Sequence, residues 1–252
     1  MTPLNGIRVL ITGATSGLGA AMATALAAAG ARVLVTGRNE ERAAAVARAL
    51  RPGAVSSALD VRNEHSVAAC VARATEAWGG IDMLVNNAGI GMRTVNPRFL
   101  TEPQPFWEVT PAGFRDVMET KVVGCFLMAR AIVPMMLQQG GGRVVNISMN
   151  EETMIRRGFV PYGPAGAGVE ALSRVMAADL AETSVTVNML LPGGRGTDTG
   201  MVPDDVPANV RARLLDPAVM GPPIVWLASD RAAGVHDRRI VANEFDPAAF
   251  RP

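Results

Sequence analysis

The stretch TGATSGLG, Thr12–Gly19, stands between a β-branched run and an alanine-rich run. The residues before it, IRVLIT (Ile7–Thr12), have the pattern of a buried strand, and the run GLGAAMATALAAAG has that of a helix. Gly13, Gly17 and Gly19 allow the chain to turn tightly and bring its backbone close to a ligand. We therefore predict a strand, a glycine-rich turn and a helix in direct succession.

A helix that begins directly after such a turn directs its N-terminal N–H groups, and the positive end of its dipole, at a bound anion. The alternative is a strand-to-helix turn that merely contains glycine, but the strand, the spacing and the helix together favour a phosphate site. A P-loop is excluded because no Lys-Ser/Thr pair follows the last glycine. The pattern predicts a dinucleotide diphosphate site formed by Gly13, Thr15, Ser16, Gly17, Leu18 and Gly19.

The alternation of apolar runs and helical runs continues along the chain. Further strands are expected at 31–37, 54–61, 81–89, 142–148 and 185–194, with an edge strand at 238–242. Helices are expected at 39–50 with Asn39 as the N-cap, at 64–79, 112–139 and 169–182, and in a segment ending at 230. This order predicts one α/β domain, residues 1–252, with a doubly wound parallel sheet and helices on both faces.

Composition sets limits on the function. The chain has 252 residues, 49% of them hydrophobic, and a net charge of +1 with both signs scattered, so neither nucleic acid nor a membrane surface is an expected partner. Cys70 and Cys125 have neither metal nor redox spacing, and we expect no metal site. No signal sequence and no span of about 18 uninterrupted apolar residues is evident, which predicts a soluble cytoplasmic protein.

Two long segments rich in proline and glycine follow predicted strands, at 91–110 and 193–217. Both emerge at the carboxyl edge of the predicted sheet, where open α/β sheets bind their ligands. We therefore expect them to act as lids over a substrate pocket rather than as disordered loops.

The end of the second strand bears on the choice of nucleotide. Many NAD sites place a carboxylate there to hold the ribose hydroxyls, whereas this chain has Gly37 followed by Arg38. An arginine can pair with a 2′-phosphate, so we expect NADP(H) in preference to NAD(H); the alternative is a solvated arginine. Asp60 is either an acceptor for the adenine amino group or the N-cap of the next helix.

Across essentially its whole length the sequence resembles the short-chain dehydrogenase/reductase family. TGATSGLG matches the family's TGxxxGxG, LDV (59–61) its adenine-side motif, NNAG (86–89) its fourth-strand motif, and VNMLLPGGRGT (187–197) its VNxxxPGxxxT. The resemblance implies further cofactor contacts from Asp60, Val61, Asn87, Ala88, Gly89, Tyr162, Pro192, Gly193 and Thr197. It also implies hydride transfer between a nicotinamide and a carbonyl or alcohol carbon.

The family's catalytic set is degenerate in this chain. Tyr162 matches the tyrosine of the family's YxxxK motif, but the lysine position is Gly166. The usual spacing places the catalytic serine on Met149, whereas a loop one residue longer places it on Ser148, which we prefer. The family's helix asparagine corresponds to Lys121.

Lys121 has two interpretations. It is either a surface residue at a position that lost its role, or a replacement for the missing lysine whose ammonium reaches Tyr162 across the space that Gly166 leaves open. On the second interpretation the catalytic residues are Tyr162, Ser148 and Lys121.

Three functions fit these observations. We favour an NADP(H)-dependent oxidoreductase acting on a small carbonyl or alcohol, with impaired or rearranged catalysis. The alternatives are an inactive cofactor-binding homologue, acting as a sensor or partner subunit, and a non-redox lyase or isomerase. The family's common assembly is a homotetramer built through two long helices, so a homo-oligomer, a tetramer or a dimer, is expected.

Overall fold

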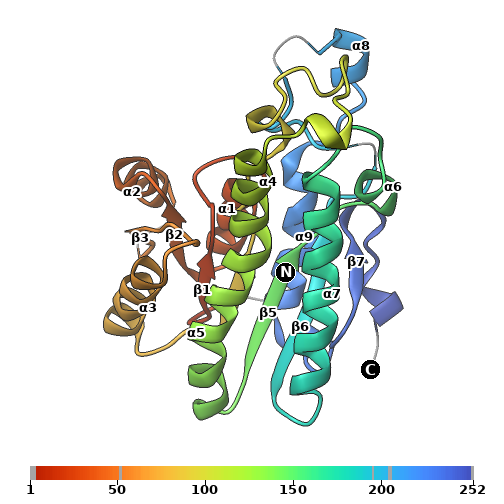
Figure 1. Ribbon diagram of the computed structural model, residues 1–252. Helices are drawn as coiled ribbons and strands as arrows, with labels where there is room; N and C mark the ends of the chain where they lie inside the picture. Colours follow the sequence, from red (N-terminus) through yellow and green to blue (C-terminus); the bar gives the residue numbers. More distant parts are fainter. Residues whose placement is uncertain (1–3, 51–52, 195, 204–205, 251–252) are drawn as a thin grey trace.

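The central feature of the computed structural model, which describes residues 4–50, 53–194, 196–203 and 206–250, is a seven-stranded sheet in the order β3-β2-β1-β4-β5-β6-β7 (Figure 1). All its strand pairs are parallel. The strands are β1 (Arg8–Ile11), β2 (Arg32–Gly37), β3 (Val55–Ala58), β4 (Met83–Asn86), β5 (Gly142–Ile147), β6 (Val185–Leu191) and β7 (Arg239–Val241). The predicted doubly wound parallel sheet is confirmed, with the C-terminal strand at its edge.

Helices cover both faces of the sheet, and each layer has its own hydrophobic core. On one face lie α1 (Gly17–Ala28), α2 (Glu40–Ala49) and α9 (Gly221–Ala228). On the other lie α3 (Glu64–Trp78), α5 (Gly124–Gln138) and α7 (Tyr162–Leu180), of which α5 and α7 run side by side in Figure 1. The strands between the two layers are therefore apolar on both sides, as the sequence indicated.

Short helices occupy much of the remaining chain. They are η1 (Met92–Thr94), η2 (Phe106–Glu108), α6 (Glu151–Met154), α8 (Ala208–Arg211), η4 (Pro217–Met220), η5 (Asp230–Ala232), η6 (Ala242–Glu244) and η7 (Pro247–Phe250). The two predicted lid segments, with η2 and α8, gather at one end of the molecule (Figure 1). Residues 195, 204 and 205 of the second segment lie outside the described residues.

The prediction that the helix after β5 begins near Val169 is wrong, because α7 begins at Tyr162. Helix propensity disfavours its glycine-rich first turns, but tertiary packing overrides that preference. A Cβ atom on Gly163 would collide with the carbonyl of Met154, so this turn can lie against α6 only with glycine there. Pro164 lies in the first turn, where the missing N–H has no helical acceptor to lose.

The long helix predicted at 112–139 is interrupted. α4 (Pro111–Met118) passes into a π-helical segment, η3 (Glu119–Val123), which passes into α5. Lys121 lies in the π-helical segment, and such segments are frequent at functional sites. By length and composition the whole stretch Pro111–Gln138 is apolar enough to cross a membrane, but here one side of α5, with Leu127, Met128, Ile132 and Met136, packs into the core with α3 and the sheet.

Candidate active site

The glycine-rich turn has the geometry that the sequence predicted. Gly13 and Gly17 adopt left-handed backbone angles, with φ of +65° and +54°, which residues other than glycine rarely adopt. Asn87 holds the turn from β4, since its Nδ2 donates to the carbonyls of Thr12 at 3.0 Å and Gly13 at 2.9 Å. A Cβ atom on Gly19 would come within 2.5 Å of that amide, so the contact requires glycine.

The first turn of α1 is suited to an anion. Ser16 is the N-cap, its side chain makes no capping bond within the described residues, and the turn has no acidic residue. The N–H groups and the dipole of this twelve-residue helix are therefore directed at the glycine turn. Thr15 and Leu18 flank the same turn.

The segment after β6 reaches this turn and contributes a buried hydroxyl group. The Cγ2 atom of Thr199 lies 3.3 Å from where a Cβ on Gly17 would be. Two residues earlier, the Oγ1 atom of Thr197 is buried and has no hydrogen-bond partner in the described part of the chain. Because buried hydroxyls are nearly always hydrogen-bonded, this atom fits a site that contacts a bound polar group.

Pro192 and Gly193, directly after β6, contact the C-terminal region. The N–H of Asn243 donates to the Pro192 carbonyl at 3.2 Å. Gly193 has a φ of +81°, and its Cα lies so close to the side chain of Asn243 that no Cβ fits there. The backbone of this motif is therefore held at the carboxyl edge of the sheet.

Gly37 and Arg38 bear on which nucleotide is bound. A Cβ on Gly37 would lie 2.7 Å from the Cγ2 atom of Thr15, so the packing leaves no space for a carboxylate at this position. Arg38 is exposed, and its charge is close enough to Asp60 to help lower the pKa of that carboxyl group.

The Asp60 carboxylate forms its main ion pair with Arg62. The Nη2 atom of Arg62 donates to Oδ2 of Asp60 at 2.8 Å, and this bond is the largest cause of the lowered Asp60 pKa. The alternative role of Asp60 as a helix N-cap is wrong, because Asn63 caps α3 by accepting from the N–H of Ser66. Val61 is buried next to Gly124 of α5.

Lys121 and Tyr162 are brought together by the fold. The Nζ atom of Lys121 lies over the Tyr162 ring, 4.9 Å from its centroid. The Lys121 stem runs along the end of β4, where a Cβ on Gly89 would lie 3.3 Å from Cγ and 3.5 Å from Nζ. Lys121 is the only lysine in the chain and Tyr162 the only tyrosine. The fold therefore places the Lys121 ammonium beside the tyrosine.

The space beside Gly166 is filled by Met149. A Cβ on Gly166 would lie 2.6 Å from Cε and 2.7 Å from Sδ of Met149, which is buried. A side chain at the family's lysine position would therefore require the Met149 side chain to shift. Gly166 and Met149 are therefore complementary in size in this structure.

Ser148 makes a contact that conflicts with the role predicted for it. Its hydroxyl donates to Oε1 of Glu170 at 2.5 Å, and the same oxygen accepts from Nε of Arg239 at 2.8 Å. Arg239 also donates to the Met149 carbonyl at 2.9 Å. The Ser148 proton is thus committed to Glu170. The amino-acid sequence does not indicate Glu170 and Arg239 as site residues, because nothing in their spacing links α7 to the C-terminal strand.

Met201, in the second lid segment, covers the Tyr162 hydroxyl. Its Sδ atom is 3.9 Å from the hydroxyl oxygen, and its side chain packs against Gly91. Arg93, from the first lid segment, donates to the carbonyls of Gly200 and Val202, both at 3.2 Å. Hydrogen bonds therefore join the two predicted lid segments, and Met201 of the second lies against the Tyr162 hydroxyl.

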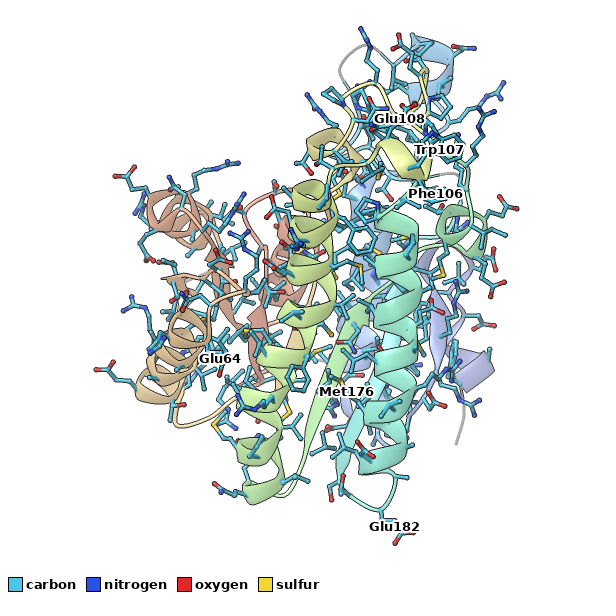
Figure 2. All side chains as sticks on the ribbon, in the orientation of Figure 1. Glu64, Phe106, Trp107, Glu108, Met176 and Glu182 are labelled. Atoms are coloured by element: carbon cyan, nitrogen blue, oxygen red, sulfur yellow. The ribbon has the colours of Figure 1, made fainter. Side chains whose placement is uncertain are left out.

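The first lid segment also exposes aromatic surface. Phe106 and Trp107 are 67% and 72% exposed and pack edge to face with ring centroids 5.2 Å apart. Figure 2 shows both residues at the lid end of the molecule, near the start of α7, whereas Glu182 marks the opposite end of that helix.

Comparison with known proteins shows what the chain is similar to. Residues 8–207 match the family described as short chain dehydrogenase. The 3-oxoacyl-(acyl-carrier-protein) reductase FabG of Vibrio cholerae is 33% identical over 249 residues, which cover 95% of this chain and 97% of that protein. The acetoacetyl-CoA reductase of Rhizobium meliloti is 34% identical over 241 residues, covering 93% of this chain and 95% of that protein.

Solved structures give the same result. A 3-ketoacyl-(acyl-carrier-protein) reductase from Brucella melitensis, complexed with NADH, superposes with a TM-score of 0.83 at 28% identity, covering 94% of this chain and 97% of that one. A gluconate 5-dehydrogenase from Burkholderia cenocepacia, in complex with NADP and tartrate, also gives 0.83 at 28% identity and covers 95% of both chains.

Proposed function

Because the chain belongs to the short-chain dehydrogenase family of oxidoreductases, we propose that it is an NADP(H)-dependent enzyme that interconverts a small carbonyl compound and its alcohol. The observation that carries this proposal is the position of the Lys121 ammonium over the Tyr162 ring, 4.9 Å from its centroid. It restores a cation beside the tyrosine although position 166 is glycine.

The residues at the carboxyl edge of the sheet fit a nicotinamide dinucleotide. Two features support this: within the described residues Oγ1 of Thr197 has no partner, and the first turn of α1 has no side-chain cap. The turn Gly13–Gly19 would hold its diphosphate and Arg38 a 2′-phosphate. The nicotinamide, when bound, supplies or accepts the hydride. Ala88 and Gly89, at the end of β4, and Thr197 would line the nicotinamide end of the site.

Tyr162 would exchange the oxygen-borne proton with the substrate. When its hydroxyl gives up that proton to a carbonyl oxygen, a negative phenolate remains, and a neighbouring cation favours this charged form. Lys121 provides the cation from the π-helical segment rather than from α7. We assign no proton-donating role to Ser148, because its hydroxyl donates to Glu170.

A cofactor-binding protein without turnover is the second candidate. Two observations favour it: Met149 fills the space of the family's lysine, and Ser148 is engaged by Glu170. Neither observation affects the glycine turn, so cofactor binding would survive in such a protein.

We also propose that the protein is a cytoplasmic homo-oligomer, a dimer or a tetramer, which associates through α5 and α7. Phe126, Leu137 and Val175 on these helices are 46%, 44% and 58% exposed. Apolar side chains exposed on adjacent long helices suit burial against a second copy.

The test is a fluorescence titration of the purified protein with NADPH and NADH, followed by assays with a panel of ketones, β-ketoesters and alcohols. Turnover that is lost in Tyr162→Phe and strongly reduced in Lys121→Met supports the enzyme. Tight NADPH binding without turnover on any substrate identifies the second candidate. Absence of binding by either nucleotide overturns both.

A further inference from the structure

We infer that Asn86 is a positioning residue for Lys121: a buried chain of hydrogen bonds aims the Asn86 carbonyl oxygen at a cavity of one water beside the lysine ammonium. This inference rests on the proposed function for its catalytic meaning. The cavity has a volume of about 10 Å³ and is lined by Thr12, Asn86, Lys121, Cys125, Ile147 and Val169, among others.

The direction of the hydrogen-bond chain is set at its far end. The Val169 carbonyl can only accept, so the Ser173 hydroxyl must donate to it, at 2.7 Å. Ser173 then accepts from Nδ2 of Asn146 at 2.8 Å, and Oδ1 of Asn146 accepts from Nδ2 of Asn86 at 2.9 Å. Rotating either amide by half a turn would set two acceptors, or two donors, against each other. The Oδ1 atom of Asn86 is therefore fixed at the free end.

That oxygen requires a partner. Asn86 is only 7% exposed, and its Oδ1 is buried without a hydrogen-bond donor among the described residues. A cavity of roughly 10–15 Å³ holds one water if two to four polar groups face it. Here the Asn86 oxygen is an acceptor, and the Lys121 ammonium, with three N–H groups, is a donor. One water between them donates a hydrogen bond to the Asn86 oxygen and accepts one from the Lys121 ammonium.

Lys121 and Cys125 both line this cavity, and the lysine charge acts on the thiol. Burial raises the pKa of the Cys125 thiol to about 12, and the positive charge of Lys121 is the largest influence that opposes the rise. Cys125 lines the cavity and also contacts both amides, with its Sγ 3.5 Å from Nδ2 of Asn86 and 3.3 Å from Oδ1 of Asn146.

This chain of hydrogen bonds therefore keeps the Lys121 ammonium in the position where it faces Tyr162. Lys121 is on a π-helical turn and its stem is flexible, so the ammonium would otherwise gain hydration by turning toward solvent. A fixed acceptor, linked through water, opposes that movement. Asn86 would not touch the substrate, so its effect on the reaction passes entirely through Lys121.

The test uses the fact that Lys121 is the only lysine. Incorporation of 13C-labelled lysine gives a single ε-methylene NMR signal, which the Tyr162 ring current shifts upfield as long as the ammonium lies over the ring. In Asn86→Leu we expect most of this shift to disappear and kcat/KM to fall about tenfold or more.

The matched control is Asn188→Leu. Asn188 is also buried in the sheet, but both ends of its amide are bonded, to the Val235 carbonyl and the Arg238 N–H, away from the cavity. The Asn188→Leu variant should therefore show the same Lys121 NMR signal as the wild type. If Asn86→Leu fails to fold, Ser173→Ala is tested instead. It removes the hydroxyl that sets the direction of the hydrogen-bond chain, so the upfield shift of the Lys121 signal should decrease.

An unchanged lysine signal in folded Asn86→Leu, or in Ser173→Ala, overturns the inference. The measurement is made on the protein without nucleotide, so it does not depend on turnover. If the signal depends on Asn86 but the wild type converts no substrate, the positioning stands and the proposed enzymatic function fails.

Discussion

The only lysine of this chain lies over the only tyrosine: the Nζ atom of Lys121 is 4.9 Å from the ring centroid of Tyr162. The two residues are 41 positions apart and come from different helices, so the contact depends on how the π-helical segment packs against α7. It explains how a member of this family can lack the lysine of the YxxxK motif and still keep a cation beside its tyrosine.

Replacing Lys121 should impair catalysis far more than cofactor binding. In Lys121→Met we expect kcat/KM for carbonyl reduction to fall about 10²-fold, because the phenolate loses its neighbouring cation. Lys121→Arg should retain part of the activity. Arg130→Met, which removes an exposed cation on α5 paired with Glu64, is the control and should behave as the wild type. Equal activities in Lys121→Met and the control would contradict the role of Lys121.

Restoring the family's lysine should require two substitutions. In Gly166→Lys the new side chain meets Met149, and such overpacking typically costs about 1–3 kcal/mol, which lowers the melting temperature. The double variant Met149→Ser with Gly166→Lys should recover stability and gain activity. Ala167→Lys, at an exposed neighbouring position, should be neutral. A Gly166→Lys protein as stable as the wild type would show that Met149 moves aside freely.

Arg38 should decide between the two nucleotides. In Arg38→Ala the 2′-phosphate loses a charged hydrogen-bond partner, normally about 1.5–3 kcal/mol, so the Kd for NADPH should rise roughly 10- to 100-fold. The Kd for NADH should not change. Arg42→Ala, on the exposed surface of α2, serves as the control in the same fluorescence titration. Equal weakening of both nucleotides by Arg38→Ala would exclude recognition of the 2′-phosphate.

The two cysteines should resist alkylation in the folded protein. Burial raises the pKa of Cys70 to about 11 and that of Cys125 to about 12, so little thiolate, the reactive form, exists at pH 8. Iodoacetamide labelling followed by mass spectrometry should show both thiols unmodified until urea unfolds the chain. Because folding raises these pKa values, the thiols favour the folded state below about pH 9 and lose that contribution as the pH rises. Rapid labelling of Cys125 at pH 8 would contradict its burial.

Local rules were sufficient for the fold and for the geometry of the glycine-rich turn. The glycine spacing of residues 12–19 and the regular alternation of apolar strands and helices predicted the parallel sheet and the position of its ligand edge. These rules failed where packing outweighs propensity. Glycine and proline disfavour a helix at Tyr162, yet α7 begins there because Gly163 lies directly against α6.

The sequence by itself determined the doubly wound fold, the glycine turn and the absence of a lysine at position 166, because each of these is a matter of residue type and spacing along one segment. Only the tertiary structure decided that Met149 fills the space beside Gly166, that Ser148 bonds Glu170, and that Lys121 faces Tyr162. Those contacts depend on distances and side-chain directions between separate elements, and spacing along the chain does not specify either.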